Sequence, residues 1–148
     1  MPKTLFTAGW VLLLLLATLL TLYSINAAYI PLTARPDRIA PSATIDEIGA
    51  KTSPDVATAL RGRRVTAATW SLASGLMLLG VLRVPYKRGE RWAWWVILVS
   101  IVGSQLISLA RIPMLDTWQG AGASGIVIGV ALVGLLLGAL HVFGKRGS

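Results

Sequence analysis

The side chains that could carry chemistry are few, and most lie outside the apolar stretches of the chain. There is no cysteine and only one histidine, His141, which excludes thiol catalysis, thiolate-bound metal and a bis-histidine haem within one chain. We interpret His141 as an interfacial side chain. No glycine-rich phosphate loop follows a strand. We therefore predict no catalytic residue, metal site or cofactor, and an enzyme is the least favoured class.

The positions of the acidic residues also give no indication of a functional site within the apolar stretches. Proton-coupled carriers usually bury a carboxylate within a membrane span. All six acidic residues of this chain fall outside the apolar stretches, which argues against a proton-driven pump of that type. These residues are Asp37, Asp46, Glu47, Asp55, Glu90 and Asp116.

Neutral polar residues, in contrast, recur inside the apolar stretches. In an up-down arrangement of four helices they would all fall in the same half of the membrane, and the other half would be almost free of polar side chains. The residues concerned are Thr18, Thr21, Ser24 and Asn26, then Thr66, Thr69 and Ser71, then Ser104, Gln105 and Ser108, and finally Ser124. This asymmetry predicts either a polar half-pocket or helix-packing contacts.

Two interpretations of these polar residues stay open. Serine and threonine hydroxyls often bond to carbonyls of their own helix, and this favours packing over binding. Gln105 is harder to explain, because an amide deep in a span should find a partner inside the bundle, such as Thr18, Thr21, Thr69 or Ser124. The candidate ligand-binding residues are Asn26, Thr69, Ser104, Gln105, Ser108, Arg111 and Asp116.

The composition indicates the elements that must position these residues. Of the 148 residues, 55% are hydrophobic and 14% charged, below the roughly 25% charged residues of typical soluble domains. A span needs about 20 mostly apolar residues. Four stretches qualify, at about 5–28, 65–82, 92–109 and 121–143. We predict an all-α, four-span, up-down transmembrane bundle forming a single integral membrane domain over residues 1–148.

The first span has an alternative interpretation. Lys3 gives a positive start and Asn26-Ala27-Ala28 is a small-residue exit, as in a signal peptide. Its apolar core is longer than the roughly 7–15 residues usual for such peptides, so we expect the segment to be retained.

The loop at 29–64 is expected to be partly folded. Thr44 and Glu47 match a capping box, which predicts a short helix over about 45–50. Ser53-Pro54-Asp55 supplies a cap, a first-turn proline and an acid, and predicts an interfacial helix that continues from about 54 into the second span. Before these helices, Pro31, Pro36 and Pro41 favour an extended path, and no strand is expected.

The cations suggest an orientation. The formal charge of +8 is better explained by lysines and arginines against anionic lipid head groups than by nucleic acid. Each side of the predicted membrane carries seven cations, but those at the N-terminus, the second loop and the tail lie in shorter segments. We therefore predict an inner (plasma) membrane protein with both termini in the cytoplasm.

The run from Val84 to Trp95 is the most distinctive in the chain. Proline ends the second span, Gly89 permits a turn, Glu90 favours the start of the third span, and cations and tryptophans anchor the interface. The Pro-Tyr-Lys-Arg-Gly-Glu-Arg-Trp-Ala-Trp segment resembles a signature of small, functionally uncharacterised bacterial membrane proteins. The resemblance covers about 44–99 and implies a four-helix architecture but no activity.

Small residues predict helix contacts and leave two functional hypotheses. Ala67, Ser71 and Gly75 share four-residue spacing, which permits close approach of backbones in lipid. The same spacing relates Gly125 to Gly129 and Gly134 to Gly138, which could pack within the chain, against a membrane partner or in a homodimer. The first hypothesis is a non-catalytic protein that scaffolds, assembles or regulates a membrane partner. The alternative is a lipid or small-molecule binding protein that uses the polar half-pocket around Gln105.

Overall fold

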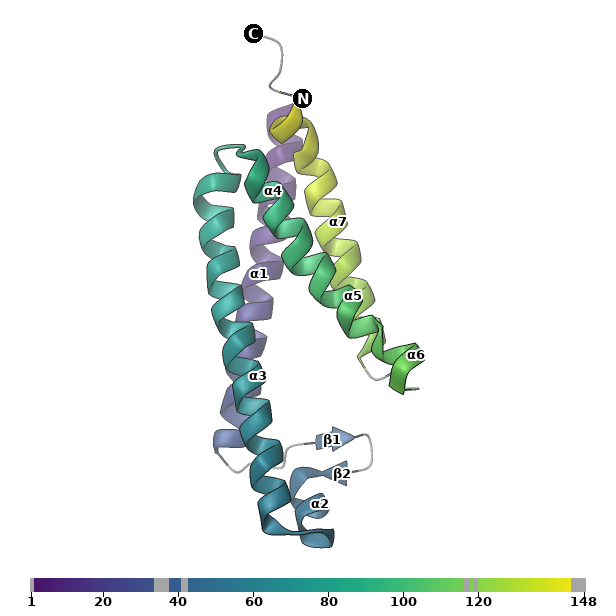
Figure 1. Cartoon of the computed structure of the whole chain (residues 1–148). Helices are drawn as coiled ribbons and strands as arrows, with labels where there is room; N and C mark the ends of the chain where they lie inside the picture. Colours follow the sequence, from purple (N-terminus) through teal and green to yellow (C-terminus); the bar gives the residue numbers. More distant parts are fainter. Residues whose placement is uncertain (1, 34–37, 41–42, 116–117, 119, 145–148) are drawn as a thin grey trace. The chain divides into compact units, whose positions relative to one another are not determined.

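The computed structural model describes residues 2–33, 38–40, 43–115, 118 and 120–144, and it is predominantly helical (Figure 1). Within these residues, four helical segments are long and apolar enough to cross a membrane. They are Lys3–Leu32, Pro54–Tyr86, Arg91–Met114 and Ala121–Phe143. The prediction of a predominantly helical chain with four long apolar helices is confirmed.

The elements follow one another as long helices interrupted by short irregular turns. The chain divides into two compact units, one formed by Leu19–Leu76 and the other by the residues up to Thr18 together with those from Met77 onward. In chain order the elements are α1 (Pro2–Leu32), β1 (Arg38–Ala40), β2 (Ala43–Thr44), α2 (Ile45–Lys51), α3 (Pro54–Val81), the π-helical η1 (Leu82–Tyr86), α4 (Arg91–Leu98), the π-helical η2 (Val99–Gly103), α5 (Ser104–Leu109), α6 (Arg111–Leu115) and α7 (Ala121–Phe143).

The unit that contains both ends of the chain is built around α7. Helix α7 packs against α4, η2 and α5 (Figure 1). The first half of α1 reaches the same helix, because Leu13 lies against Gly134 and Gly9 lies against the Gly134 carbonyl. Leu13 and Ile97 are completely buried in this unit. The bounds of α7 agree with the predicted fourth span.

The other unit contains the first loop. Strand β1 pairs antiparallel with β2, with Arg38 opposite Thr44, and α2 follows directly. The predicted capping box is confirmed. The Thr44 amide donates to Glu47 Oε2 at 2.8 Å, and the Glu47 amide donates to Thr44 Oγ1 at 3.2 Å. In the same unit, Thr21 of α1 lies against Gly75 of α3.

Helix α3 confirms the predicted continuity from the loop into the second apolar stretch. It begins at Pro54 and runs without a break to Val81. Pro54 is tolerated because a first-turn amide has no partner within its helix. The predicted cap is weak, since the Val56 amide lies 3.4 Å from Ser53 Oγ.

Two expectations for the first loop were wrong. The path is not extended at Pro31, because α1 continues through this residue to Leu32. Proline lacks the amide that would bond to the carbonyl four residues earlier, and the helix ends one residue after Pro31. The short strands β1 and β2 were not expected, because their pairing depends on a reversal of the chain and not on a periodic pattern. Pro36 and Pro41 lie outside the described residues.

The ends of the second and third apolar helices also differ from prediction. Pro85 does not stop the second helix, because it lies inside η1, and the turn comes only at Gly89, which has a φ of 75°. A π-helical turn accommodates the missing proline amide by shifting the backbone hydrogen bonds. The third helix contains η2 and extends past Leu109, through a turn at Ala110, into α6.

Candidate functional site

Several of the hydroxyl groups in the long apolar helices bond to their own helices. Thr18 Oγ1 donates to the Leu14 carbonyl at 2.8 Å, and Ser24 Oγ donates to Leu20 at 2.9 Å. Thr66, Thr69 and Ser104 likewise donate to carbonyls three or four residues earlier, at 2.9–3.0 Å. Such bonds satisfy a hydroxyl in lipid without any partner helix. For these residues the geometry matches the packing interpretation.

The candidate ligand-binding residues are placed as follows. Asn26 and Thr69 are exposed residues of the unit formed by Leu19–Leu76. In the other unit, Ser104 is exposed, whereas Gln105 and Ser108 are half-buried. The side-chain amide of Gln105 makes no hydrogen bond with any residue that the structure describes. Asp116 lies outside the described residues.

Of these candidates, the structure brings Ser108 and Arg111 together. Arg111 Nε donates to the Ser108 carbonyl at 2.9 Å, and a terminal guanidinium nitrogen donates to Ser108 Oγ at 2.8 Å. Both bonds hold the guanidinium at the end of α5, where the serine carbonyl lacks a continuing helical turn. Arg111 is exposed there. A shallow apolar hollow lies elsewhere, along the face of α1 formed by Thr4, Thr7, Ala8, Val11, Leu12 and Leu15.

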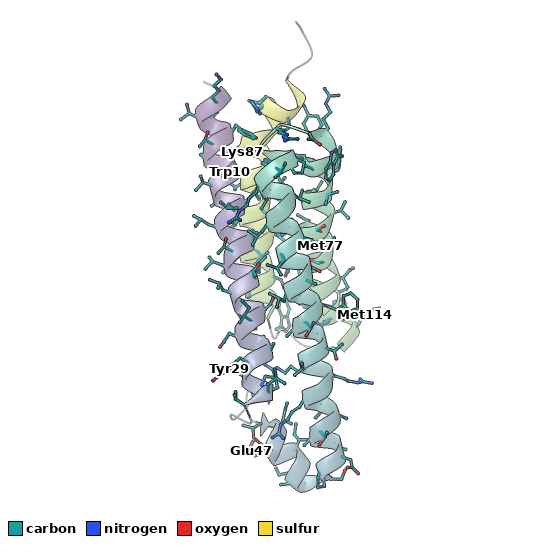
Figure 2. All side chains as sticks on the ribbon, turned by 90° about the vertical axis from the view of Figure 1, so that its left-hand side faces the viewer. Trp10, Tyr29, Glu47, Met77, Lys87 and Met114 are labelled. Carbon is teal, nitrogen blue, oxygen red and sulfur yellow. The ribbon has the colours of Figure 1, made fainter. Side chains whose placement is uncertain are left out.

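The turn between α3 and α4 is tied to α1 by an indole group. Trp10 Nε1 donates to the Leu82 carbonyl at 2.8 Å. Lys87 Nζ lies 5.0 Å from the centre of a Trp10 ring, and Figure 2 shows the two residues next to each other, at the level of the N-terminal third of α1. The prediction assigned tryptophans and cations in this segment to interfacial anchoring. Trp10 lies outside that segment and was not singled out; it serves as a hydrogen-bond donor to the π-helical segment that contains Pro85.

Sequence reasoning missed the buried position of Tyr86. Its side chain is completely buried, and its ring stacks on Phe6 with a centroid distance of 5.6 Å. Its hydroxyl group lies against Gly138 and has no hydrogen-bond partner among the described residues. Phe6 also contacts His141, at a centroid distance of 4.1 Å. The signal available in the sequence was only a tyrosine beside a helix-breaking proline and a glycine in a distant helix.

The glycines of α7 divide into two groups. A Cβ atom at Gly134 would overlap Leu13, and one at Gly138 would overlap the Tyr86 hydroxyl, so both glycines are used for packing within the chain. At Gly125 and Gly129 a Cβ would meet no described atom within 4 Å. The proposed intermolecular role is therefore restricted to Gly125 and Gly129, although the four glycines have similar spacing.

Comparisons with known proteins add no functional assignment. No family model matches the chain, and no curated protein or solved structure matches it either. The resemblance of the segment around Gly89 to small bacterial membrane proteins stays a prediction. Within the described part of the chain, no three histidine, aspartate or glutamate side chains gather as metal ligands would.

Proposed function

We propose that this chain is a non-catalytic, multi-pass protein of the plasma membrane that scaffolds, assembles or regulates a membrane partner. Its four apolar helices are proposed to form an up-down bundle with both termini in the cytoplasm. The observation that carries the proposal is the folded part of the first loop, which we call the loop module and define as β1, β2, α2 and the first two turns of α3.

The loop module has the features of a specifically folded surface. Ile45 is completely buried, although it belongs to a helix of only seven residues. Asp46 pairs with Arg61 across 15 positions of the chain, and Gly49 lies against Ala57. Together with the capping box, these contacts give the first loop a defined fold. A loop that only joins two helices of a bundle does not require such a fold.

The chemistry of the loop module favours recognition over catalysis. Its described ionisable groups are engaged in capping or pairing or are exposed on helices, and Asp46 and Arg61 are bonded to each other. Val56, in the first turn of α3, is 39% exposed and presents apolar surface within the module. Ordered loops on a rigid scaffold commonly bind partners, and an extramembrane loop is well suited to a protein partner.

The test is quantitative co-purification from native membranes, with mass spectrometry of bound proteins, lipids and small molecules. Ile45→Asp would place a charge in a buried site and unfold the loop module. Ala50→Asp adds the same charge at an exposed position of the same helix and is the matched control. We expect a protein partner that is recovered with the wild type and with Ala50→Asp but is lost with Ile45→Asp.

The same experiment separates the two functional hypotheses. The midpoint of thermal unfolding in detergent checks that the spans of Ile45→Asp remain folded. Recovery of the same protein partner with Ile45→Asp would contradict the role of the loop module. A small molecule that is lost with Gln105→Leu, in the absence of a protein partner, would instead support the polar half-pocket.

A further inference from the structure

The turn that joins the second and third apolar helices concentrates positive charge. Between Arg83 and Arg91 there are four cationic side chains and one carboxylate, a net charge of +3. We call this segment the basic turn and define its cations as Arg83, Lys87, Arg88 and Arg91. Arg83, Lys87 and Arg88 are exposed, and Arg91 is half-buried.

No carboxylate of the described chain neutralises this charge. The salt bridge found among the described residues joins Arg61 to Asp46 and includes no residue of the basic turn. Glu90 is the acidic residue of the turn, and its carboxylate accepts a hydrogen bond from Trp92 Nε1 at 2.5 Å. Lys87 lies over Trp10, and the Arg91 guanidinium lies 5.8 Å from the centre of the Phe143 ring, so aromatic rings and not acids hold these cations.

The backbone at the end of the turn adds a second feature that favours the binding of an anion. Helix α4 begins at Arg91, and its N-cap residue, Glu90, makes no side-chain capping bond. The first amides of a helix lie at its positive end and lack the usual helical partners. Here the Ala93 amide donates to the Glu90 carbonyl at 3.2 Å, and the Arg91 and Trp92 amides make no bond to a described residue. An uncapped helix start beside cationic side chains is an arrangement that binds phosphate groups.

The surroundings of the basic turn indicate which kind of phosphate compound would bind there. The turn connects two helices that are apolar enough to cross a membrane. Large apolar side chains flank it and face outward, since Val84, Trp92 and Trp95 are between 50% and 54% exposed. Exposed tryptophan beside cations is typical of the head-group region of a bilayer. A ligand at this place therefore meets phosphate-binding groups and apolar surface together.

We propose that the basic turn is a binding site for the phosphate group of an anionic phospholipid. Arg83 contributes charge from the start of η1 and Arg88 from the turn that follows it, and the start of α4 contributes backbone amides. The net charge of +3 favours lipids with a net negative head group over zwitterionic ones. This site is independent of the proposed partner of the loop module.

The experiment measures lipid binding by the full-length protein in a neutral detergent, using native mass spectrometry. Phosphatidylglycerol is the anionic probe and phosphatidylcholine the zwitterionic one. The variant Arg83→Gln/Arg88→Gln removes two exposed charges of the basic turn and leaves Lys87 on Trp10. The variant Lys51→Gln/Arg63→Gln removes two exposed charges elsewhere and is the control. The midpoint of thermal unfolding without lipid checks that both variants fold.

We expect wild type and control to bind phosphatidylglycerol more tightly than phosphatidylcholine. With about 1 kcal/mol for each cation near an anionic surface, Arg83→Gln/Arg88→Gln should bind phosphatidylglycerol about 30-fold more weakly. Unchanged binding by this variant, or an equal loss in both variants, would overturn the proposal. Displacement of the lipid by glycerol phosphate at equal concentration would assign the site to soluble phosphates and also overturn it.

Discussion

At the scale of single residues, the contact between Tyr86 and Gly138 shows how closely two helices approach in this chain. The tyrosine hydroxyl is buried against the glycine backbone and makes no hydrogen bond to a described residue. A buried hydroxyl group without a partner costs free energy. Tyr86 therefore stabilises this contact through the packing of its ring against Phe6, and not through the polarity of its hydroxyl group.

This contact leads to a prediction for Gly138→Ala. The added Cβ would overlap the Tyr86 hydroxyl and would lie 3.1 Å from its ring carbon Cζ. We expect the free energy of unfolding in detergent to fall by about 1–3 kcal/mol, as is usual for overpacking. Adding Tyr86→Phe should restore most of this loss, because the clashing oxygen is removed.

Two controls make this prediction specific. Gly129→Ala places the same methyl group on an open part of α7 and should be neutral, or stabilising by about 0.5–1 kcal/mol. Tyr86→Phe alone should not reduce stability, because no hydrogen bond to a described residue is lost. An equal loss of stability in Gly138→Ala and Gly129→Ala would show that the close approach is absent.

At the scale of elements, the two π-helical segments alter how the apolar helices end and pack. In η1, Pro85 lacks the amide that would continue the α-helical pattern, and the Trp10 indole donates to a carbonyl of the same segment. In α7, the Leu135 carbonyl accepts a bond from Trp94 Nε1 at 3.0 Å. Indole groups thus link neighbouring helices through backbone carbonyls, which suits an environment without water.

A double-mutant cycle tests the link between Trp10 and the η1 segment. Trp10→Phe keeps an aromatic ring but removes the donor to the Leu82 carbonyl. Pro85→Ala supplies a backbone amide and should allow regular α-helical bonding. We expect Trp10→Phe to destabilise the wild type and to cost less in the Pro85→Ala background, with a coupling energy of about 0.6 kcal/mol. Additive effects on unfolding would contradict the link.

At the scale of the whole molecule, the proposed topology follows from four apolar helices and the distribution of cations. Lys51 is the last residue of α2, and Lys87 directly follows η1. Helix α3 therefore lies between the two lysines in the chain. If α3 crosses the bilayer, these lysines must lie on opposite sides. The short, cation-dense segments favour the cytoplasm for Lys87.

Reporter fusions at these two lysines test the topology. A reporter active only in the cytoplasm should function after Lys87 and fail after Lys51, and a reporter active only outside should show the reverse. Using both kinds of reporter controls for fusions that fail to fold. Cytoplasmic activity after Lys51 would overturn the orientation, and the same side for both lysines would overturn the assignment of α3 as a span.

The sequence by itself determined the features that depend on local chemistry. Four apolar stretches are visible because lipid requires about 20 apolar residues for each spanning helix. The capping box at Thr44 and the start of α3 at Pro54 were predictable because caps involve residues only a few positions apart. The bounds of α7 followed from the glycine before it and the charged tail after it.

Only the tertiary structure decided the features that depend on contacts between distant residues. Gly125 and Gly129 have the same four-residue spacing as Gly134 and Gly138, but only the second pair packs against another segment of the described chain. The pairing of β1 with β2 and the burial of Tyr86 likewise require segments that no periodic pattern connects. Spacing determines which residues share a helix face, whereas the position of the neighbouring helices determines which part of that face is covered.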